Sequence, residues 1–344
     1  MNTRIFKLLR NEDSHSYIDE AARILKSGGL VAFPTETVYG LGGVATHADA
    51  AKKIYAAKGR PSDNPLIIHI ADPEDAEKYA VTCELYYKLA KAFMPGPLTV
   101  ILPKRDTVPY EVTGGLDTVA VRCPSHPIAR ALIRSTGEAI AAPSANLSGS
   151  PSPTAAEHVI SDLYGRVEGI VDGGECDIGL ESTIVAVRDG GVVLLRPGAV
   201  TADALSCVCE RVEIASAVTE ALAENERPLS PGMKYRHYAP KAPLVLLDGD
   251  DEPVLSYMFR MQNAEKCVVI CYSEELDKLR NERLICIGSK DDPEEQARNL
   301  FAALRKADEL DGEIVYAHLP SKEGMGLALY NRLIRAAAHT VLMV

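Results

Sequence analysis

The 344-residue sequence lacks the features that would place it in several large classes of protein. No apolar run approaches the ~18 residues that a membrane span needs, and no secretory hydrophobic region follows the initial Met, so we expect a cytoplasmic protein without membrane segments. The eight cysteines form no Cys-x-x-Cys pair. Metal-ligand spacing is therefore absent, and buried thiols in a reducing compartment are expected. A Walker A motif is missing as well.

The sequence also lacks an excess of basic residues. Its net charge of −11 argues against a protein that coats nucleic acid without specificity. The charge is unevenly distributed, because residues 1–150 contain 17 Lys and Arg against 16 Asp and Glu, whereas residues 151–226 contain 4 against 14. A site for an anionic ligand is therefore expected in the first of these stretches.

The most informative segment that is present is the loop at residues 58–66, Lys-Gly-Arg-Pro-Ser-Asp-Asn-Pro-Leu. It carries two cations and an amide and no apolar side chain before its end, so it cannot contribute to a core. Glycine and two prolines restrict the backbone locally, which predicts that Lys58, Arg60 and Asn64 point together at an anionic ligand. The ligand should carry phosphate or carboxylate.

Helical spacing alternates with short apolar strands along most of the chain, which predicts an α/β protein of two domains. Residues 1–220 should form the first domain around a twisted mixed sheet, because STIVAV and VVLLRP, separated by Asp-Gly-Gly, indicate an antiparallel hairpin. Residues 221–243 are rich in proline and indicate a linker. Residues 244–344 should form a smaller parallel sheet that is Rossmann-like in layout only, since it has no Gly-rich phosphate fingerprint.

Four polar segments each follow or precede a predicted strand, at residues 34–43, 58–66, 142–154 and 180–185. Each combines hydroxyl or amide side chains with glycine or proline, which places polar groups on a rigid backbone at the edge of a sheet, where α/β proteins bind ligands. Turn formation alone would also explain any one of them. Together they predict a ligand site.

Single polar residues within the strands leave two interpretations open. His69 is either a hydrogen-bonded core residue or a ligand contact. Arg122 and Arg196 each end an apolar run before a proline, so each is either a surface residue or an anion clamp. Asp172 and Glu181 could form an acid pair, but a solvated surface position is the simpler expectation.

The segments PTETVYGLG, KGRPSDNPL, PGPLT, VAVRCP, PSANLSG, ESTIV and LRPG together resemble the YrdC-like family of threonylcarbamoyl-AMP synthases, over roughly residues 15–200. The segment SPGMKYRHYAP and the small C-terminal domain resemble the long, two-domain form of that family. The resemblance implies a YrdC-like twisted mixed sheet with helices and a central cavity, followed by a Rossmann-like α/β domain with a parallel sheet.

The resemblance also implies an activity. L-Threonine, bicarbonate or CO2, and ATP with magnesium would give L-threonylcarbamoyladenylate and pyrophosphate. The adenylate would supply a downstream tRNA threonylcarbamoyl transferase complex, for the threonylcarbamoyladenosine modification of tRNAs that read ANN codons. Lys58 and Arg60 would be catalytic through charge stabilisation. The protein residues that would hold the metal are not indicated.

By the same resemblance, two sets of residues would bind the two organic substrates. The residues implied for ATP are Lys58, Arg60, Asn64, Thr118, Ser144, Asn146, Ser152, Arg196, Tyr235, Arg236 and His237. The residues implied for L-threonine are Thr37, His69, Arg122, Ala142 and Ser182. The last three ATP residues lie in the Pro-rich segment, which would act as a lid that excludes water from the adenylate.

Two other functions are compatible with a YrdC-like domain. One is a double-stranded RNA-binding or tRNA-binding module without catalysis, whose affinity would fall steeply with salt. The acidic net charge argues against it, although weak tRNA binding through a local patch remains open. The other is carbamoyl transfer in hydrogenase maturation, which is disfavoured because the acylphosphatase and zinc-finger modules of those enzymes are missing.

Overall fold

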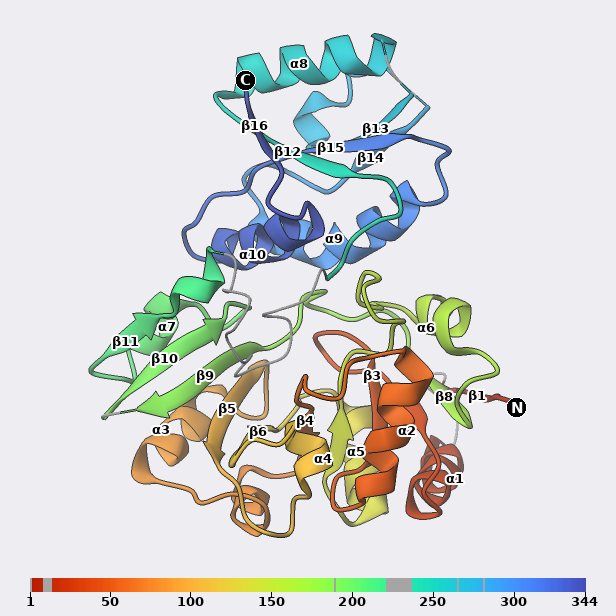
Figure 1. The fold of residues 1–344 in the computed structure, drawn as a ribbon, viewed down its shortest axis with the longest axis vertical. Coiled ribbons are helices and arrows are strands. Elements are labelled where there is room, and N and C mark those ends of the chain that lie inside the picture. Colours follow the sequence, from red (N-terminus) through yellow and green to blue (C-terminus); the bar gives the residue numbers. More distant parts are fainter. Residues whose placement is uncertain (1, 9–13, 189, 221–236, 265, 281) are drawn as a thin grey trace. The chain divides into compact units, whose positions relative to one another are not determined.

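A computed structural model describes residues 2–8, 14–188, 190–220, 237–264, 266–280 and 282–344 (Figure 1). The chain divides into a larger unit, Met1–Ser148, Ser152–Asp177 and Glu181–Lys234, and a smaller unit, Gly149–Pro151, Ile178–Leu180 and Tyr235–Val344. Most of the predicted linker, 221–236, lies outside the described residues, so the domain limits at 220 and 244 stay a prediction. No helix in the described part of the chain is long and apolar enough to cross a bilayer.

The larger unit is built on an 11-stranded sheet of mixed direction, in the order β1-β8-β2-β3-β7-β4-β6-β5-β9-β10-β11. Among its central strands, β4 runs parallel to β6 but antiparallel to β7, and β5 runs antiparallel to β6. The predicted hairpin is confirmed as the antiparallel pair β9–β10. The strands are β1 (Arg4–Lys7), β2 (Val31–Phe33), β3 (Gly40–Val44), β4 (Ile67–His69), β5 (Leu98–Pro103), β6 (Thr118–Arg122), β7 (Ile140–Ala142), β8 (Gly169–Asp172), β9 (Thr183–Arg188), β10 (Gly191–Arg196) and β11 (Val212–Ile214).

Two of the apolar cores of the larger unit join helices to the sheet. One core joins α1 and α5 to Phe6, Val31 and Phe33, and the other joins α2, α3 and α6 to strands β3 to β6 and β9. Side chains of a strand alternate between the faces, so neighbouring residues serve different cores. The helical elements are α1 (Ser14–Lys26), α2 (Ala48–Lys58), η1 (Pro73–Lys78), α3 (Glu84–Phe93), α4 (Tyr110–Thr113), α5 (Pro127–Thr136), α6 (Ala156–Leu163), α7 (Ala202–Ser206) and η2 (Ser216–Val218).

The smaller unit contains a five-stranded sheet in the order β14-β13-β15-β12-β16, with every neighbouring pair parallel. Helix α8 packs on one face through Val254 and Met258, whereas α9 and α10 lie on the opposite side (Figure 1). The elements are β12 (Leu244–Asp248), α8 (Asp251–Ala264), β13 (Cys267–Cys271), η3 (Ser273–Glu275), β14 (Leu284–Cys286), α9 (Pro293–Ala307), β15 (Ile314–His318), α10 (Gly326–Ala336) and β16 (Val341–Met343).

The predicted α/β class, with a mixed sheet followed by a smaller parallel sheet, is confirmed. One prediction was too general, because buried thiols were expected throughout. None of the eight cysteines, all of which the structure describes, forms a disulfide, but Cys83, Cys207 and Cys286 are exposed. The first two lie at a helix N-cap and a helix C-cap, where apolar sequence neighbours do not ensure burial.

Candidate functional site

Lys58, at the end of α2, is buried against the turn that follows β7. Its ammonium donates to the carbonyl of Ser144 at 2.5 Å and to the carbonyl of Asn146, and only 2% of the residue is exposed. The Ser144 hydroxyl donates to Asn146 Oδ1 at 2.5 Å, which closes the turn. A buried ammonium needs acceptors for its three N–H groups, and the two carbonyls together with Asn146 Oδ1, at 3.4 Å, supply them. Helix α2 ends directly after Lys58, because Gly59 takes a left-handed φ of 63°.

The rest of the loop at residues 58–66, called the cationic loop below, turns back on itself. The Arg60 guanidinium donates to the carbonyls of Asn64, at 3.4 Å, and Pro65, at 3.2 Å. Lys58 and Arg60 therefore face different carbonyls, which differs from the expected common direction toward one anion. Asn64 is 2% exposed, and its Oδ1 is buried without a partner among the residues that the structure describes. The loop is anchored by Gly114, whose φ is 61° and where a Cβ would approach the Asp63 carbonyl oxygen to 2.9 Å.

A second group of polar side chains crosses the centre of the sheet. His69 on β4 lies opposite Arg122 on β6, which in turn lies opposite Thr99 on β5. The Thr99 hydroxyl is 2.7 Å from the Ser182 hydroxyl, just before β9. Arg196, at the end of β10, donates to the carbonyl and the hydroxyl of Ser182 at 3.0 and 3.1 Å. Strand pairing thus brings together residues that are far apart in sequence, and both arginines are buried rather than on the surface.

Sequence reasoning missed Glu36, which lies within the PTETVYG segment. Its carboxylate accepts from Arg122 Nη2 at 2.7 Å, and the two residues are 5% and 4% exposed. Burial acts to raise the pKa of Glu36, but the charge and hydrogen bond of Arg122 outweigh it, so the pKa is lowered and the carboxylate is ionised. An acidic residue within the polar segment 34–43 was the sequence feature that could have indicated Glu36 as a site residue. Its partner Arg122 is 86 residues away, so the sequence pattern did not reveal the pair.

His69 is uncharged at neutral pH. Burial, and next the charge of Arg122, lower its pKa to about 3. Its ring meets the Phe33 ring edge to face, with centroids 6.0 Å apart. The imidazole is therefore a neutral hydrogen-bonding group beside a charged pair and contributes no positive charge of its own.

Three buried atoms of this cluster have no partner within the described residues: Glu36 Oε2, Arg122 Nε and His69 Nδ1. Buried polar atoms are nearly always hydrogen-bonded, and an unpaired one costs about 1–3 kcal/mol. Three of them on neighbouring side chains indicate a place where a ligand supplies the missing partners. These atoms offer a ligand a hydrogen-bond donor beside the positive charge of Arg122, an acceptor beside the negative charge of Glu36, and the neutral imidazole nitrogen of His69.

Glu181 and Ser152 form a further buried pair, in which the Ser152 hydroxyl donates to the Glu181 carboxylate. Glu181 is 6% exposed, so the expectation of a solvated position was wrong for it. The physical reason is that Glu181 directly precedes Ser182 in the network and has a hydroxyl partner inside. Asp172 is partly exposed, and its carboxylate accepts from the amide of Gly174.

The remaining predicted residues have varied environments. Thr37 is fully buried, and its hydroxyl is 2.8 Å from that of Thr35. Ala142 is the last residue of β7, two positions before Ser144, and Thr118 is the partly exposed first residue of β6. His237 belongs to the smaller unit, whereas positions 235 and 236 lie outside the described residues. The implied roles of Tyr235, Arg236 and His237 in ATP binding stay a prediction.

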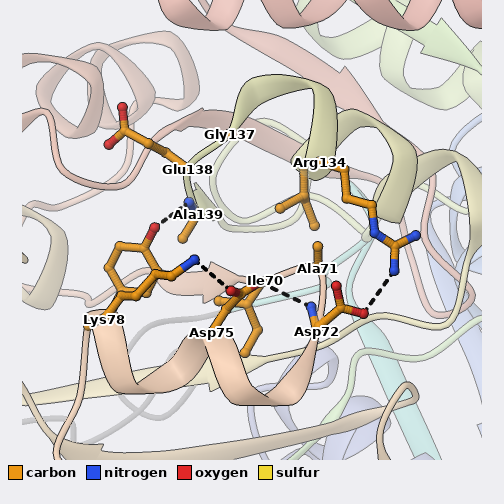
Figure 2. Close-up of a pocket in the computed structure, with 11 residues that line it drawn as sticks. Ile70, Ala71, Asp72, Asp75, Lys78, Arg134, Gly137, Glu138 and Ala139 are labelled. Carbon is orange, nitrogen blue, oxygen red and sulfur yellow. Dashed lines mark hydrogen bonds and ion pairs between the residues drawn. The ribbon is translucent and has the colours of Figure 1, made fainter.

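A separate pocket of about 200 Å³ lies between η1 and the turn from α5 to β7 (Figure 2). Among its charged groups, Asp72 pairs with Arg134 at 2.8 Å and Asp75 with Lys78 at 2.7 Å, while Glu138 accepts from the Thr46 hydroxyl. None of the predicted site residues lines it. We assign no ligand to this pocket.

The described residues contain no group of three or more His, Cys, Asp or Glu side chains placed to hold a metal ion. Magnesium commonly keeps several waters and binds through phosphates and one or two carboxylates. Glu181, which is buried and precedes Ser182 in the sequence, is one carboxylate that could supply such a contact.

Comparisons with known proteins agree on one family. The sequence model of the Sua5/YciO/YrdC family, described as telomere recombination, matches residues 23–198, and that of the threonylcarbamoyl-AMP synthase C-terminal domain matches residues 200–338. The threonylcarbamoyl-AMP synthase of Bacillus subtilis is 47% identical over 94% of this chain and 94% of its own length. That of Pyrococcus abyssi is 45% identical over 94% and 95%. The structure of P. abyssi Sua5 complexed with L-threonine superposes with a TM-score of 0.92 at 43% identity, covering 99% of this chain and 100% of that one.

Proposed function

The chain belongs to the Sua5/YciO/YrdC family in its long, two-domain form, and from this premise we propose that it synthesises L-threonylcarbamoyladenylate from L-threonine, bicarbonate and ATP, with release of pyrophosphate. The observation that carries the proposal is the buried cluster of Arg122, His69 and Glu36, whose three unpartnered atoms match the polar groups of a small amino acid. The named relatives are threonylcarbamoyl-AMP synthases, and one related structure contains L-threonine.

In this proposal the threonine carboxylate binds Arg122 and His69. Ser182, which is held between Thr99 and Arg196, and Thr37, which follows Glu36 in the sequence, contact the rest of the amino acid. A buried carboxylate is stabilised by a guanidinium that is itself fixed, because little ordering cost remains at binding. The backbone at Ala142 completes the amino-acid site.

The nucleotide is proposed to bind along the cationic loop and the turn after β7. Lys58 and Arg60 would exchange some of their carbonyl partners for phosphate oxygens, while the buried Asn64 Oδ1 offers an acceptor. The other nucleotide contacts proposed are Thr118, Ser144, Asn146, Ser152, Arg196, Tyr235, Arg236 and His237. Magnesium, when bound, would neutralise charge on the phosphates.

The reaction requires no enzyme nucleophile. The ammonium group of threonine first loses a proton to solvent. The resulting amine forms a bond to the carbon of CO2 and releases a second proton. If the carbon comes from bicarbonate, its hydroxide leaves with that second proton as water. The resulting carbamate oxygen then bonds to the α-phosphorus as the bond to pyrophosphate breaks. Negative charge accumulates on the phosphates in that second step, so fixed cations such as Lys58 and Arg60 would lower its barrier.

The product is a mixed anhydride that water hydrolyses, so a reaction that consumes it must follow closely. We propose that a tRNA threonylcarbamoyl transferase complex takes it up in the cytoplasm to modify tRNAs that read ANN codons. Whether this chain itself contacts tRNA stays a prediction.

The proposed activity is tested by pyrophosphate release from ATP, measured with threonine and bicarbonate each present or omitted. Release should require both, and Lys58→Ala or Arg60→Ala should abolish it. The matched control is Lys78→Ala, because Lys78 is an exposed cation outside the site. ATP turnover that ignores threonine would contradict the proposal.

A further inference from the structure

The unpartnered atoms around Arg122 differ in chemistry in a way that the binding of a carboxylate alone does not explain. Arg122 Nη2 and Glu36 Oε1 are joined at 2.7 Å, which leaves Arg122 Nε as a buried donor and Glu36 Oε2 as a buried acceptor. A positive and a negative group therefore lie side by side, each with one hydrogen-bonding atom that has no partner in the described part of the chain. Such a pair forms a binding site for a ligand that carries one positive and one negative charge.

The balance of buried charges also indicates a ligand that carries a positive group. If only a carboxylate joined Arg122, two buried anions would contact that one guanidinium, because the other buried arginine of the group, Arg196, donates to Ser182. An uncompensated buried charge is strongly unfavourable. The nearby imidazoles do not supply the missing positive charge, because burial lowers the pKa of both His69 and His126. A cation on the ligand, next to Glu36, restores the balance.

An α-amino acid at neutral pH has this pair of charges on one carbon atom. We propose that Glu36 binds the ammonium group of the amino-acid substrate through Oε2 while Arg122 binds its carboxylate, so that the site selects a zwitterion over a simple carboxylic acid. The inference rests on the proposed function, since it takes threonine as that amino acid. Glu36 is then a specificity-determining residue.

The test is Glu36→Gln, which keeps the shape and an acceptor for Arg122 but removes the negative charge. The full-length variant is titrated by displacement calorimetry with L-threonine, with 3-hydroxybutyrate, which lacks the ammonium group, and with L-2-aminobutyrate, which lacks the hydroxyl. Affinity for the two amino acids should fall about ten- to a hundredfold, as expected for a charge-assisted hydrogen bond, and affinity for 3-hydroxybutyrate should not fall.

The matched control is Glu275→Gln in the smaller unit, because Glu275 is similarly buried and paired, with His318 at 3.0 Å. It should leave all three affinities unchanged. Equal weakening of all three ligands by Glu36→Gln would show a merely structural role and overturn the inference, while leaving the proposed function in place. Weakening confined to the two hydroxyl-bearing ligands would overturn it too, because Oε2 would then accept from the hydroxyl. An unsubstituted protein that does not bind threonine would overturn both.

Discussion

Removing Arg122 should destabilise the protein by far more than removing an exposed arginine. Arg122→Met would leave Glu36 as a buried charge without its cation, because the two residues are 4% and 5% exposed and joined at 2.7 Å. Breaking such a pair from one side costs about 3–5 kcal/mol of unfolding free energy. Arg134→Met is the control: its 2.8 Å pair with Asp72 is about half exposed, so the loss should be about 0–1 kcal/mol.

The loss should depend on pH in a defined direction. In the unsubstituted protein the pKa of Glu36 lies below its usual 4.5, so its contribution to stability is complete above pH 4.5 and is lost as the pH falls through the lower, folded-state value. Without Arg122 burial dominates and raises the pKa above 4.5, so the variant should lose stability at neutral pH and recover it on acidification. The difference between the two proteins should therefore shrink as the pH falls from 7 toward 4.

Urea unfolding measures this difference, followed by far-ultraviolet circular dichroism and by tyrosine fluorescence, since the chain has 14 tyrosines and no tryptophan. The double variant Arg122→Met with Glu36→Gln should recover part of the lost stability, because no charge is then left buried. A loss below about 1 kcal/mol, or one that stays constant between pH 7 and 4, would refute the reasoning that Glu36 is a buried anion held by Arg122.

Three further results are expected. Gly114→Ala should raise KM for ATP by displacing the cationic loop, since a Cβ would lie 2.9 Å from the Asp63 carbonyl oxygen. Gly137→Ala is the control, because Gly137 also has a positive φ but an added Cβ would meet nothing within 4 Å, so KM should stay unchanged. Equal effects of the two substitutions would contradict this prediction. Ser182→Ala should raise KM for threonine several-fold by removing the hydroxyl between Thr99 and Arg196, and an unchanged KM would argue against that contact. Because the pKa of His69 is about 3, this residue should not titrate between pH 6 and 8. The dependence of kcat/KM on pH in that range should therefore have the same shape in the unsubstituted protein and in His69→Asn, and an inflection that only the unsubstituted protein shows would contradict this.

Local signals predicted the elements that depend on local chemistry. Helix α2 ends at Gly59 because glycine tolerates a left-handed φ, and the hairpin β9–β10, predicted from Asp-Gly-Gly, is confirmed. Strands β3 and β7 were not predicted. The segment GLGGV is typical of a glycine loop and IAA is only three residues long, so each is a strand because of its partners across the sheet.

The site shows the same division. The types of residue were predictable, since cations, amides and hydroxyls at strand edges indicate an anionic ligand. Their partners were not, because Lys58 meets the carbonyls of Ser144 and Asn146, and Glu36 meets Arg122, across about 86 to 88 residues of sequence. Strand order and register determine these contacts, and single-residue patterns contain neither.

The most direct test of the proposed function is the isotopic composition of the product. The purified full-length protein is incubated with ATP, magnesium, L-threonine and ¹³C-labelled bicarbonate, and the mixture is analysed at once by liquid chromatography with mass spectrometry. An adenylate that contains threonine and one ¹³C atom should form together with an equal amount of pyrophosphate, and it should be missing with Arg60→Ala. Threonyl-adenylate without the labelled carbon, or pyrophosphate release without any threonine-containing adenylate, would contradict the account.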